Sequence, residues 1–336
     1  MGNICLDQNY STTRLLSIAI ANSQVNLFSN NILPNKSFLH GAHRYNCEGG
    51  LRTRGYFKQS YEKKGESWLV CNADGQLEES VELLNNLVGN ELPLITIITV
   101  VFNGEKFLED TIKSVINQTY PNIEYIIIDG GSTDDTLKII QKYESVIDYW
   151  ISEKDDGIYD AMNKGINLSC GTWINFMNCG DVFNGIGVFE GFNSINDRID
   201  IIFSDTILLN ANKQTIHKAS IKSKSFIHQS IIYRRDIHRI HGLYLTATGV
   251  TISDYLFFSN LLREENSIWI NHPISIYRID GVSSKPSHYY QKLGVNLIYG
   301  HSSTSKVVLQ LSYKILLQYF YYPIKKIYLK FGVRNG

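Results

Sequence analysis

The chain has 336 residues, of which 43% are hydrophobic and 19% are charged. This composition is typical of a globular protein with a sizeable core and excludes an intrinsically disordered chain. Basic and acidic residues number 32 each, so no overall charge attracts nucleic acid or an acidic partner. The five cysteines form no CxxC pair, which indicates a reduced, cytoplasmic compartment rather than a disulfide framework or a zinc site. Without a secretory signal or an apolar run of about 18 residues, we expect a soluble or peripheral protein.

Residues 1–92 do not alternate between strand and helix patterns. Their beginning is rich in Asn and Ser, and residues 45–64 are aromatic and basic. Residues 77–88 have the apolar spacing of a short amphipathic helix. We interpret residues 1–92 as an extension without a core of its own.

From Leu94 to Asp181, four apolar strands alternate with segments of helical spacing. The strands are expected to start near Leu94, Ile123, Ile147 and Thr172. This alternation predicts an α/β fold, a Rossmann-like, mostly parallel sheet flanked by helices. Ligands bind such a sheet beyond the carboxyl ends of its strands, where each of these strands meets a polar loop.

The first two of these loops predict helix caps and one ligand contact. Asn103 is a good N-cap, and a helix beginning there directs free backbone N–H groups at the crevice. Ser132, with Asp135 three residues later, has the spacing of a capping box. Capping does not explain Asp129, because a carboxylate that ends a buried strand costs free energy unless something binds it. Asp129 is therefore a candidate contact for a base or a ribose.

The third loop leads into a helix with several polar groups. Asp156 precedes it, and the spacing puts Asp160, Asn163 and Lys164 on one side. A ligand-binding face and a plain solvated face are both compatible with this spacing.

The fourth loop contains Asn178 and Asp181. A carboxylate here suits Mg²⁺ or Mn²⁺ bound to a diphosphate, since hard cations prefer oxygen ligands. One Asp and one Asn supply few ligands, but a phosphate-bound Mg²⁺ needs only one or two carboxylates.

Residues 206–285 form a second block. Short strand-like runs occupy residues 230–235, 267–272 and 274–279, and a helix follows Ser253 and Asp254. His228 and Gln229 also stand out, although a lone histidine is more often structural than catalytic. Ser253 or Asp254 equally suits a plain N-cap.

The tail, residues 286–336, is predicted to be helical. Between residues 307 and 322, apolar and aromatic side chains share one face and Gln310, Lys314 and Gln318 share the other. Such a helix lies in a membrane interface or docks on the protein's own core.

Taken together, these segments resemble the inverting family 2 glycosyltransferases of the GT-A fold, in the branch of bacterial O-antigen and exopolysaccharide biosynthesis. The matching segments are ITVVFNGEKFLEDTIKSVINQTY, EYIIIDGGSTDDTLKII, ISEKDDGIYDAMNKGI and GTWINFMNCGD, with HQS and SDY further on. The resemblance implies a nucleotide-sugar-binding half in residues 93–205 and an acceptor-binding half in residues 206–285. The helical tail, residues 286–336, is then expected to associate with a membrane.

The resemblance also implies a role for individual residues. Asp254 matches the place of the catalytic base, and His228 and Gln229 would contact the acceptor or the diphosphate. Asn178 and Asp181 fall where many relatives have an Asp-x-Asp metal motif, but the first acid is replaced by Asn178, which puts the use of Mg²⁺ or Mn²⁺ in doubt. The residues that would bind the nucleotide-sugar are Thr99, Val101, Phe102, Asn103, Asp129, Gly131, Ser132, Asp134, Asp156, Asp160, Asn163 and Lys164.

The implied reaction moves a sugar from a nucleotide-sugar donor to a saccharide acceptor, with inversion. The acceptor is expected to be lipid-linked, at the inner face of the cell membrane, and no nucleic acid takes part. A catalytically degenerate nucleotide-sugar-binding protein is the alternative. The lack of a Gly-rich loop with Arg and Lys at the first strand argues against a nucleotidyltransferase, and the lack of GxGxxG argues against a dehydrogenase.

Overall fold

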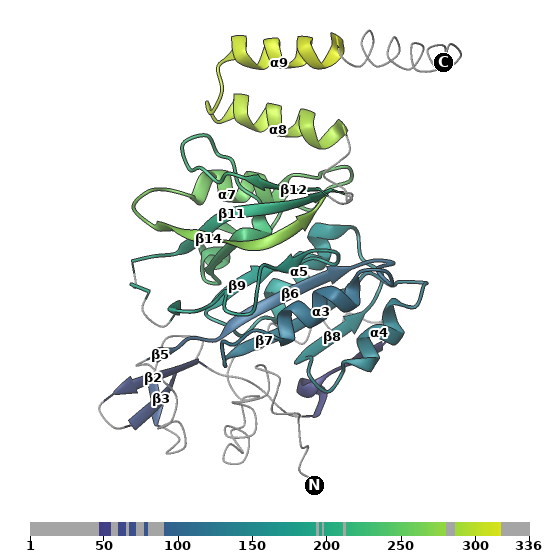
Figure 1. Ribbon diagram of the computed structural model, residues 1–336, viewed down its shortest axis with the longest axis vertical. Coiled ribbons are helices and arrows are strands. Elements are labelled where there is room, and N and C mark those ends of the chain that lie inside the picture. Colours follow the sequence, from purple (N-terminus) through teal and green to yellow (C-terminus); the bar gives the residue numbers. More distant parts are fainter. Residues whose placement is uncertain are drawn as a thin grey trace. The chain divides into compact units, whose positions relative to one another are not determined.

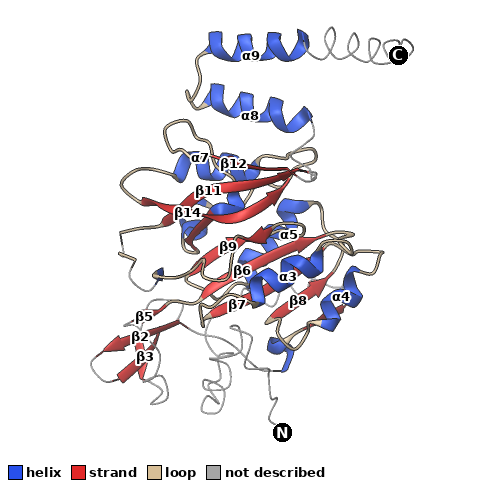
Figure 2. Cartoon of the chain, viewed as in Figure 1, coloured by secondary structure: helices blue, strands red, loops and turns tan. Residues whose placement is uncertain are grey.

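The structure, a computed structural model, describes residues 47–54, 60–64, 67–71, 77–79, 91–192, 195–196, 198–210, 213–279 and 286–316. Figure 2 distinguishes its helices, strands and loops. In chain order the elements are β1 (Cys47–Gly49), η2 (Leu51–Arg54), β2 (Ser60–Lys64), β3 (Ser67–Cys71), β4 (Leu77–Glu79), β5 (Glu91–Leu92), β6 (Ile95–Val101), α3 (Leu108–Ile116), β7 (Ile123–Asp129), α4 (Thr136–Lys142), β8 (Tyr149–Ser152), α5 (Ile158–Leu168), β9 (Trp173–Phe176), β10 (Val182–Phe183), β11 (Ile201–Asn210), β12 (Lys213–His217), η5 (His228–Ser230), β13 (Ile231–Arg234), α6 (Ile237–His241), α7 (Ser253–Leu261), β14 (Ser267–Arg278), α8 (Pro286–Ile298) and α9 (Thr304–Leu316).

The main sheet confirms the predicted α/β fold. The four predicted strands are β6, β7, β8 and β9, and they pair in parallel. The sheet order is β1-β8-β7-β6-β9-β13-β11-β14-β10, with β12 paired to β11 (Figure 1). Strands β2 to β5 form a second, smaller sheet.

One edge of the main sheet collects most of the strand ends. Strand β13 is antiparallel to both β9 and β11, and β11 is parallel to β14. Therefore β11 and β14 run in the same direction as β6, β7, β8 and β9. We call the edge where these six strands end the carboxyl edge.

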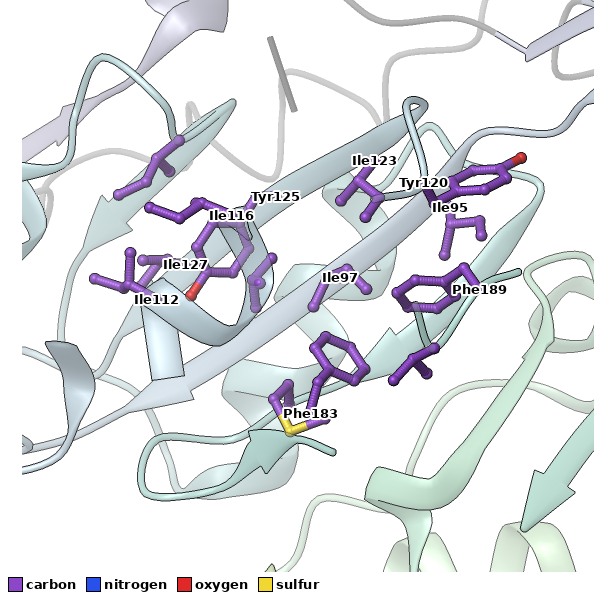
Figure 3. Packing of buried hydrophobic residues seen from close by; sticks show 14 of the residues in the cluster. Ile95, Ile97, Ile112, Ile116, Tyr120, Ile123, Tyr125, Ile127, Phe183 and Phe189 are labelled. Carbon is purple, nitrogen blue, oxygen red and sulfur yellow. The ribbon is translucent and has the colours of Figure 1, made fainter. Parts of the chain in front are cut away.

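The core forms because alternate strand residues face opposite sides of the sheet. On one side, Ile95 and Ile97 of β6 belong to the same buried cluster as Ile112 and Ile116 of α3 (Figure 3). On the other side α5 packs closely on β6, since a Cβ atom at Gly165 would lie 2.5 Å from Ile98 Cγ2. Helices on both faces thus hold the carboxyl edge in place.

One prediction for local structure is wrong, and two of the predicted strand-like runs are continuous. Residues 77–79 begin no helix but form β4, which pairs with β3, and residues 80–88 lie outside the described part of the chain. The runs at residues 267–272 and 274–279 form one strand, β14, which continues through Pro273. The register against β11 shifts between Ser204 and Thr206, a bulge that accommodates the proline.

Part of the amino-terminal extension is built into the main sheet. Strand β1 pairs with β8, and Leu51 of η2 is fully buried. Arg52 forms a buried ion pair with Glu124 of β7, which also accepts a hydrogen bond from Thr96 Oγ1 (2.6 Å). The described start of the extension thus packs into the core of the main sheet. The proposed domain boundaries stay a prediction.

The chain divides into two compact units, residues 1–281 and residues 282–336. In the second unit α8 packs against α9, which confirms a helix over the described part of residues 307–322. Leu309 and Tyr313 of α9 are 71% and 64% exposed, whereas Val307 is buried. None of the described helices is both long enough and apolar enough to cross a membrane.

Candidate active site

The loops after β6 and β7 bind each other through a hydrogen-bond network. Three backbone N–H groups of the first loop donate to side chains of the second: Asn103 to Ser132 Oγ (2.7 Å), Gly104 to Thr136 Oγ1 (2.8 Å) and Glu105 to Asp134 Oδ2 (3.1 Å). We call residues 103–105 and 132–136 the paired loops. Their N–H groups are not free for a ligand, contrary to the prediction for a helix N-terminus at Asn103.

Both predicted helix starts are too early. Helix α3 begins at Leu108, because Asn103 has a φ of +52° and accepts a hydrogen bond from Thr133 N (2.8 Å) instead of capping. Helix α4 begins at Thr136, and Ser132 makes no capping box. Asp134 Oδ1 accepts the hydrogen bond of Thr136 N (3.0 Å). The cap residues are thus used to join the two loops.

Asp129 is fully buried at the end of β7, but its carboxylate has partners within the protein. Oδ1 accepts a hydrogen bond from Ser132 Oγ (2.5 Å) and Oδ2 accepts one from Ser152 Oγ (2.6 Å). These bonds offset the cost of burial without a ligand. A contact between Asp129 and a base or ribose stays a prediction.

The polar groups around α5 do not share one side of the helix. Lys164 forms ion pairs with Glu153 (2.8 Å) and Asp160 (3.1 Å). Asn163 is buried and turns to Tyr244, donating from Nδ2 to its carbonyl (2.8 Å) and accepting from its N–H at Oδ1 (2.9 Å). Asn163 therefore fixes the loop before α7 and lies apart from the exposed Asp156.

Other predicted donor contacts differ in their exposure. Thr99 and Val101 are buried in the sheet, and Thr99 Oγ1 donates to the carbonyl of Met177 (2.7 Å). Phe102 is 64% exposed beside the paired loops, and Gly131 has a φ of +81°. Of this group, Phe102 has the side chain most open to a ligand.

Asp254 lies in the first turn of α7 between two donors from distant segments. Tyr159 of α5 donates its hydroxyl to Oδ1 (2.6 Å), and Nδ1 of His228 lies 2.6 Å from Oδ2. On the other side of the imidazole, Nε2 lies 3.1 Å from Asn178 Nδ2. The structure therefore brings Asn178, His228 and Asp254 together and adds Tyr159.

The surroundings keep the Asp254 carboxyl ionised. Burial alone would raise its pKa, but the interaction with His228 and the hydroxyl of Tyr159 outweigh burial and lower the pKa to about 2. Burial also raises the pKa of Tyr159 far above its usual range, so Tyr159 donates as a neutral phenol. Asp254 is thus in the form that can accept a proton.

Asp181 is also buried, but it is held differently. Oδ2 accepts a hydrogen bond from Gln229 Nε2 (2.6 Å), and Oδ1 accepts one from the backbone N–H of Arg278 (3.0 Å). Burial raises the pKa of Asp181 to about 7, and the hydrogen bonds and positive groups offset this only in part. The preceding Gly180 has a φ of +99°, which allows the tight turn that buries Asp181.

The residues at positions 178 and 181 supply few ligands for a divalent cation as they are arranged. Each Asp181 oxygen already accepts one hydrogen bond, and the Asn178 amide nitrogen points at His228. Asn178 Oδ1 is buried without a hydrogen-bond partner, but one amide oxygen is too few for a cation. Within the described residues, no group of three or more His, Cys, Asp or Glu side chains is arranged to hold a metal ion.

The sequence analysis missed three residues of this region: Ser152, Tyr159 and Arg278. Ser152 and Arg278 are each the last residue of a strand at the carboxyl edge, so their position at a strand end was a usable signal. Tyr159 lies within the run from Asp156 to Lys164, but an aromatic residue at helical spacing usually indicates core packing.

Comparisons with known proteins identify a family and a fold similar to those of this chain. Residues 96–249 match the model of the family described as glycosyl transferase family 2. An uncharacterized glycosyltransferase of Mycobacterium tuberculosis is 44% identical over 94 residues, which cover 28% of this chain and 36% of that protein. A PGL/p-HBAD biosynthesis glycosyltransferase of Mycobacterium bovis is 29% identical over 45% of this chain and 63% of its own length. The chain thus spans about one to two thirds of these relatives.

A third relative is matched over nearly its whole length. An uncharacterized glycosyltransferase of Haemophilus influenzae is 26% identical over 68% of this chain and 96% of that protein. Residues 1–349 of S. aureus TarS, in complex with UDP-GlcNAc, have a similar fold, with a TM-score of 0.50 at 16% identity over 60% of this chain and 64% of that one. This likeness and the matched family confirm the expected GT-A-type fold. The family match thus covers residues 96–249, a little under half of the chain.

Proposed function

We propose that this chain transfers a sugar from a nucleotide-sugar donor to a saccharide acceptor with inversion of the anomeric carbon, in cell-surface polysaccharide biosynthesis. The observation that carries the proposal is the Asp254 carboxylate, held by Tyr159 and His228 a few residues beyond the stretch that matches the family 2 model. A general base needs to be unprotonated and within reach of the proton that it takes. Asp254 meets the first condition, and the carboxyl edge is where the fold binds ligands.

In the proposed reaction the acceptor hydroxyl gives its proton to Asp254 as its oxygen bonds to the anomeric carbon. The bond from that carbon to the diphosphate oxygen breaks on the opposite side, and its electron pair leaves with the nucleoside diphosphate. One back-side displacement inverts the anomeric carbon. Asp129 and exposed groups beside the paired loops, such as Phe102, are proposed to contact the nucleotide, and His228 and Gln229 are proposed to contact the acceptor or the diphosphate.

No step of this proposal passes through a metal, because no group of three or more His, Cys, Asp or Glu side chains among the described residues is arranged to hold one. Dependence on Mg²⁺ or Mn²⁺ is a separate prediction. The acceptor is proposed to be lipid-linked at the inner face of the cell membrane, with the exposed apolar side chains of α9 in the membrane interface.

The test is a thermal-shift panel of UDP-, GDP- and dTDP-sugars, UDP-GlcNAc included, each with and without Mn²⁺. Any donor that stabilises the chain is then assayed for release of its nucleoside diphosphate. Stabilisation with release supports a transferase, whereas stabilisation without release supports the degenerate binding protein. If no nucleotide-sugar stabilises the chain, the proposal fails.

A further inference from the structure

Arg278 is the last residue of β14 and lies at the carboxyl edge. Its backbone N–H donates to Asp181, and its Nε donates to the carbonyl of Gly180 (3.3 Å). Its guanidinium carbon lies 4.3 Å from the ring centre of Phe107, in the turn that leads into α3. Arg278 therefore joins the segments that follow β6 and β9, where the donor's diphosphate is expected.

Among the described residues, the guanidinium of Arg278 forms no ion pair, although its charge helps to lower the pKa of the neighbouring Asp181 carboxyl. Some other arginines of the described chain do lie beside carboxylates, such as Arg52 with Glu124 and Arg234 with Asp200. No carboxylate of the described residues lies within 4.0 Å of the Arg278 guanidinium nitrogens, and its terminal nitrogens make no hydrogen bond there. Because a guanidinium binds phosphate oxygens in pairs, these terminal nitrogens suit a diphosphate.

Few other positive groups at this edge are available. The backbone N–H groups of the paired loops donate to Ser132, Thr136 and Asp134. Lys164 is bound to Glu153 and Asp160. Positions 178 and 181 supply few ligands for a divalent cation. Lys106 and Lys154 also follow strands of this edge, but both are exposed, whereas Arg278 is half-buried and is held in position by an aromatic ring and a carbonyl. Arg278 is therefore the best-placed side-chain cation for a leaving diphosphate among the described residues.

We infer that Arg278 binds the diphosphate of the donor and compensates the negative charge that develops as it leaves. This inference rests on the proposed function. The bond between the anomeric carbon and the diphosphate oxygen breaks with its electron pair on that oxygen, while the acceptor's proton goes to Asp254. Stacking on Phe107 keeps the guanidinium in place before the charge develops, which makes the interaction more effective.

The chain contains a matched control for this role. Arg234 also stacks on an aromatic ring, with its guanidinium carbon 4.8 Å from the Trp173 ring centre, and its Nε also donates to a carbonyl, that of Ile199 (2.9 Å). However, Arg234 ends β13 opposite Trp173, the first residue of β9, so it lies at the other edge of the sheet. Arg234→Gln removes the same ring and carbonyl contacts, and in addition the pair with Asp200, at the other edge of the sheet.

The experiment measures affinities of the full chain for UDP, GDP and dTDP and for the corresponding nucleosides by calorimetry. For the nucleotide that binds, Arg278→Gln is expected to weaken diphosphate binding by roughly 10- to 100-fold and to leave nucleoside binding within about twofold. Arg278→Lys is expected to recover part of the loss, because it keeps the charge but not the paired hydrogen bonds. Arg234→Gln should change neither affinity.

Thermal unfolding of each variant separates binding from folding. If Arg278→Gln and Arg234→Gln lower the unfolding temperature alike and only the former weakens diphosphate binding, the inference stands. If Arg278→Gln leaves diphosphate affinity unchanged, or weakens nucleoside binding equally, the inference is overturned and the proposed function is not. If the wild-type chain binds none of the three diphosphates, the proposed function fails, and this inference fails with it.

Discussion

The two halves of the carboxyl edge differ in how their polar groups are used. In the paired loops, residues about 30 apart in the chain bind each other. Around Asp254, groups come from segments up to 95 residues apart, and two amide oxygens, Asn178 Oδ1 and Gln229 Oε1, are buried without a partner among the described residues.

This difference distinguishes polar groups that stabilise the edge from polar groups that are available to bind or react with a ligand. A satisfied network adds stability and rigidity but has few donors or acceptors left for a ligand. Unpaired buried groups cost stability, and proteins retain them chiefly where a function uses them. We therefore expect substitutions in the paired loops to affect stability first and substitutions around Asp254 to affect turnover first.

The largest effect is expected from Asp254→Asn. This change keeps the size of the side chain but removes the proton acceptor, so turnover should fall by roughly 10²- to 10⁴-fold. Nucleotide affinity should stay nearly unchanged. The measurement is release of nucleoside diphosphate from the donor identified in the thermal-shift panel. Asp236→Asn, at an exposed carboxylate before α6, is the control. Unchanged turnover in Asp254→Asn would refute the assignment of the base.

The second effect concerns pH and Asp181, whose pKa is about 7 in the folded chain against an ordinary value of 3.8. The folded state therefore holds this proton more tightly than the unfolded chain, and stability is lost as pH rises between these two values. The loss is fully developed above pH 7 and amounts to up to about 4 kcal/mol.

Asp181→Asn should remove this loss. As the pH rises from about 5 to about 8, the free energy of unfolding of the wild type should fall. In Asp181→Asn this fall should be smaller by about 2 to 3 kcal/mol. Urea denaturation at both pH values measures it. Asp205→Asn is the control. The pKa of the wild-type Asp205 carboxyl is lowered, because Lys218 and the N–H of Ala219 outweigh its burial. In this variant the free energy of unfolding should therefore change with pH over this range as it does in the wild type. Equal slopes in all three proteins would contradict the prediction.

A smaller effect is expected in the paired loops from Thr136→Val. Valine has the same shape but leaves the N–H of Gly104 without its acceptor and Asp134 without a hydroxyl donor. The expected cost is about 1 to 3 kcal/mol in the free energy of unfolding. The exposed Thr133→Val is the control. A Thr136→Val variant that keeps its stability but loses turnover would reverse the roles assigned to the two halves.

The smallest effect is expected from Lys164→Met, which removes ion pairs with Glu153 and Asp160. Such pairs near the surface contribute about 1 kcal/mol or less. Thermal unfolding measures this loss, and the same sample titrated with the nucleotide tests the predicted donor contact. If Lys164 also binds the donor, affinity should fall more than stability does.

The strand positions and the α/β architecture follow from the sequence, because apolar periodicity is a local property. The strands predicted near Leu94, Ile123 and Thr172 begin at Ile95, Ile123 and Trp173. The caps at Asn103 and Ser132 were predicted wrongly, since the competing partner of each side chain lies about 30 residues away. Residues 77–79 were predicted wrongly for a similar reason, since they form a strand by pairing with β3 and local apolar spacing does not show this partner.

The sequence by itself determined that polar loops end the parallel strands and that Asp254 follows them in a second block. Only the tertiary structure decided which of these groups are free. It gave Asp129 two serine donors, placed Asp181 between Gln229 and the backbone of Arg278, and set Tyr159 and His228 on either side of Asp254. The physical reason is that hydrogen-bond partners, burial and pKa depend on distances across the sheet, which strand periodicity does not encode.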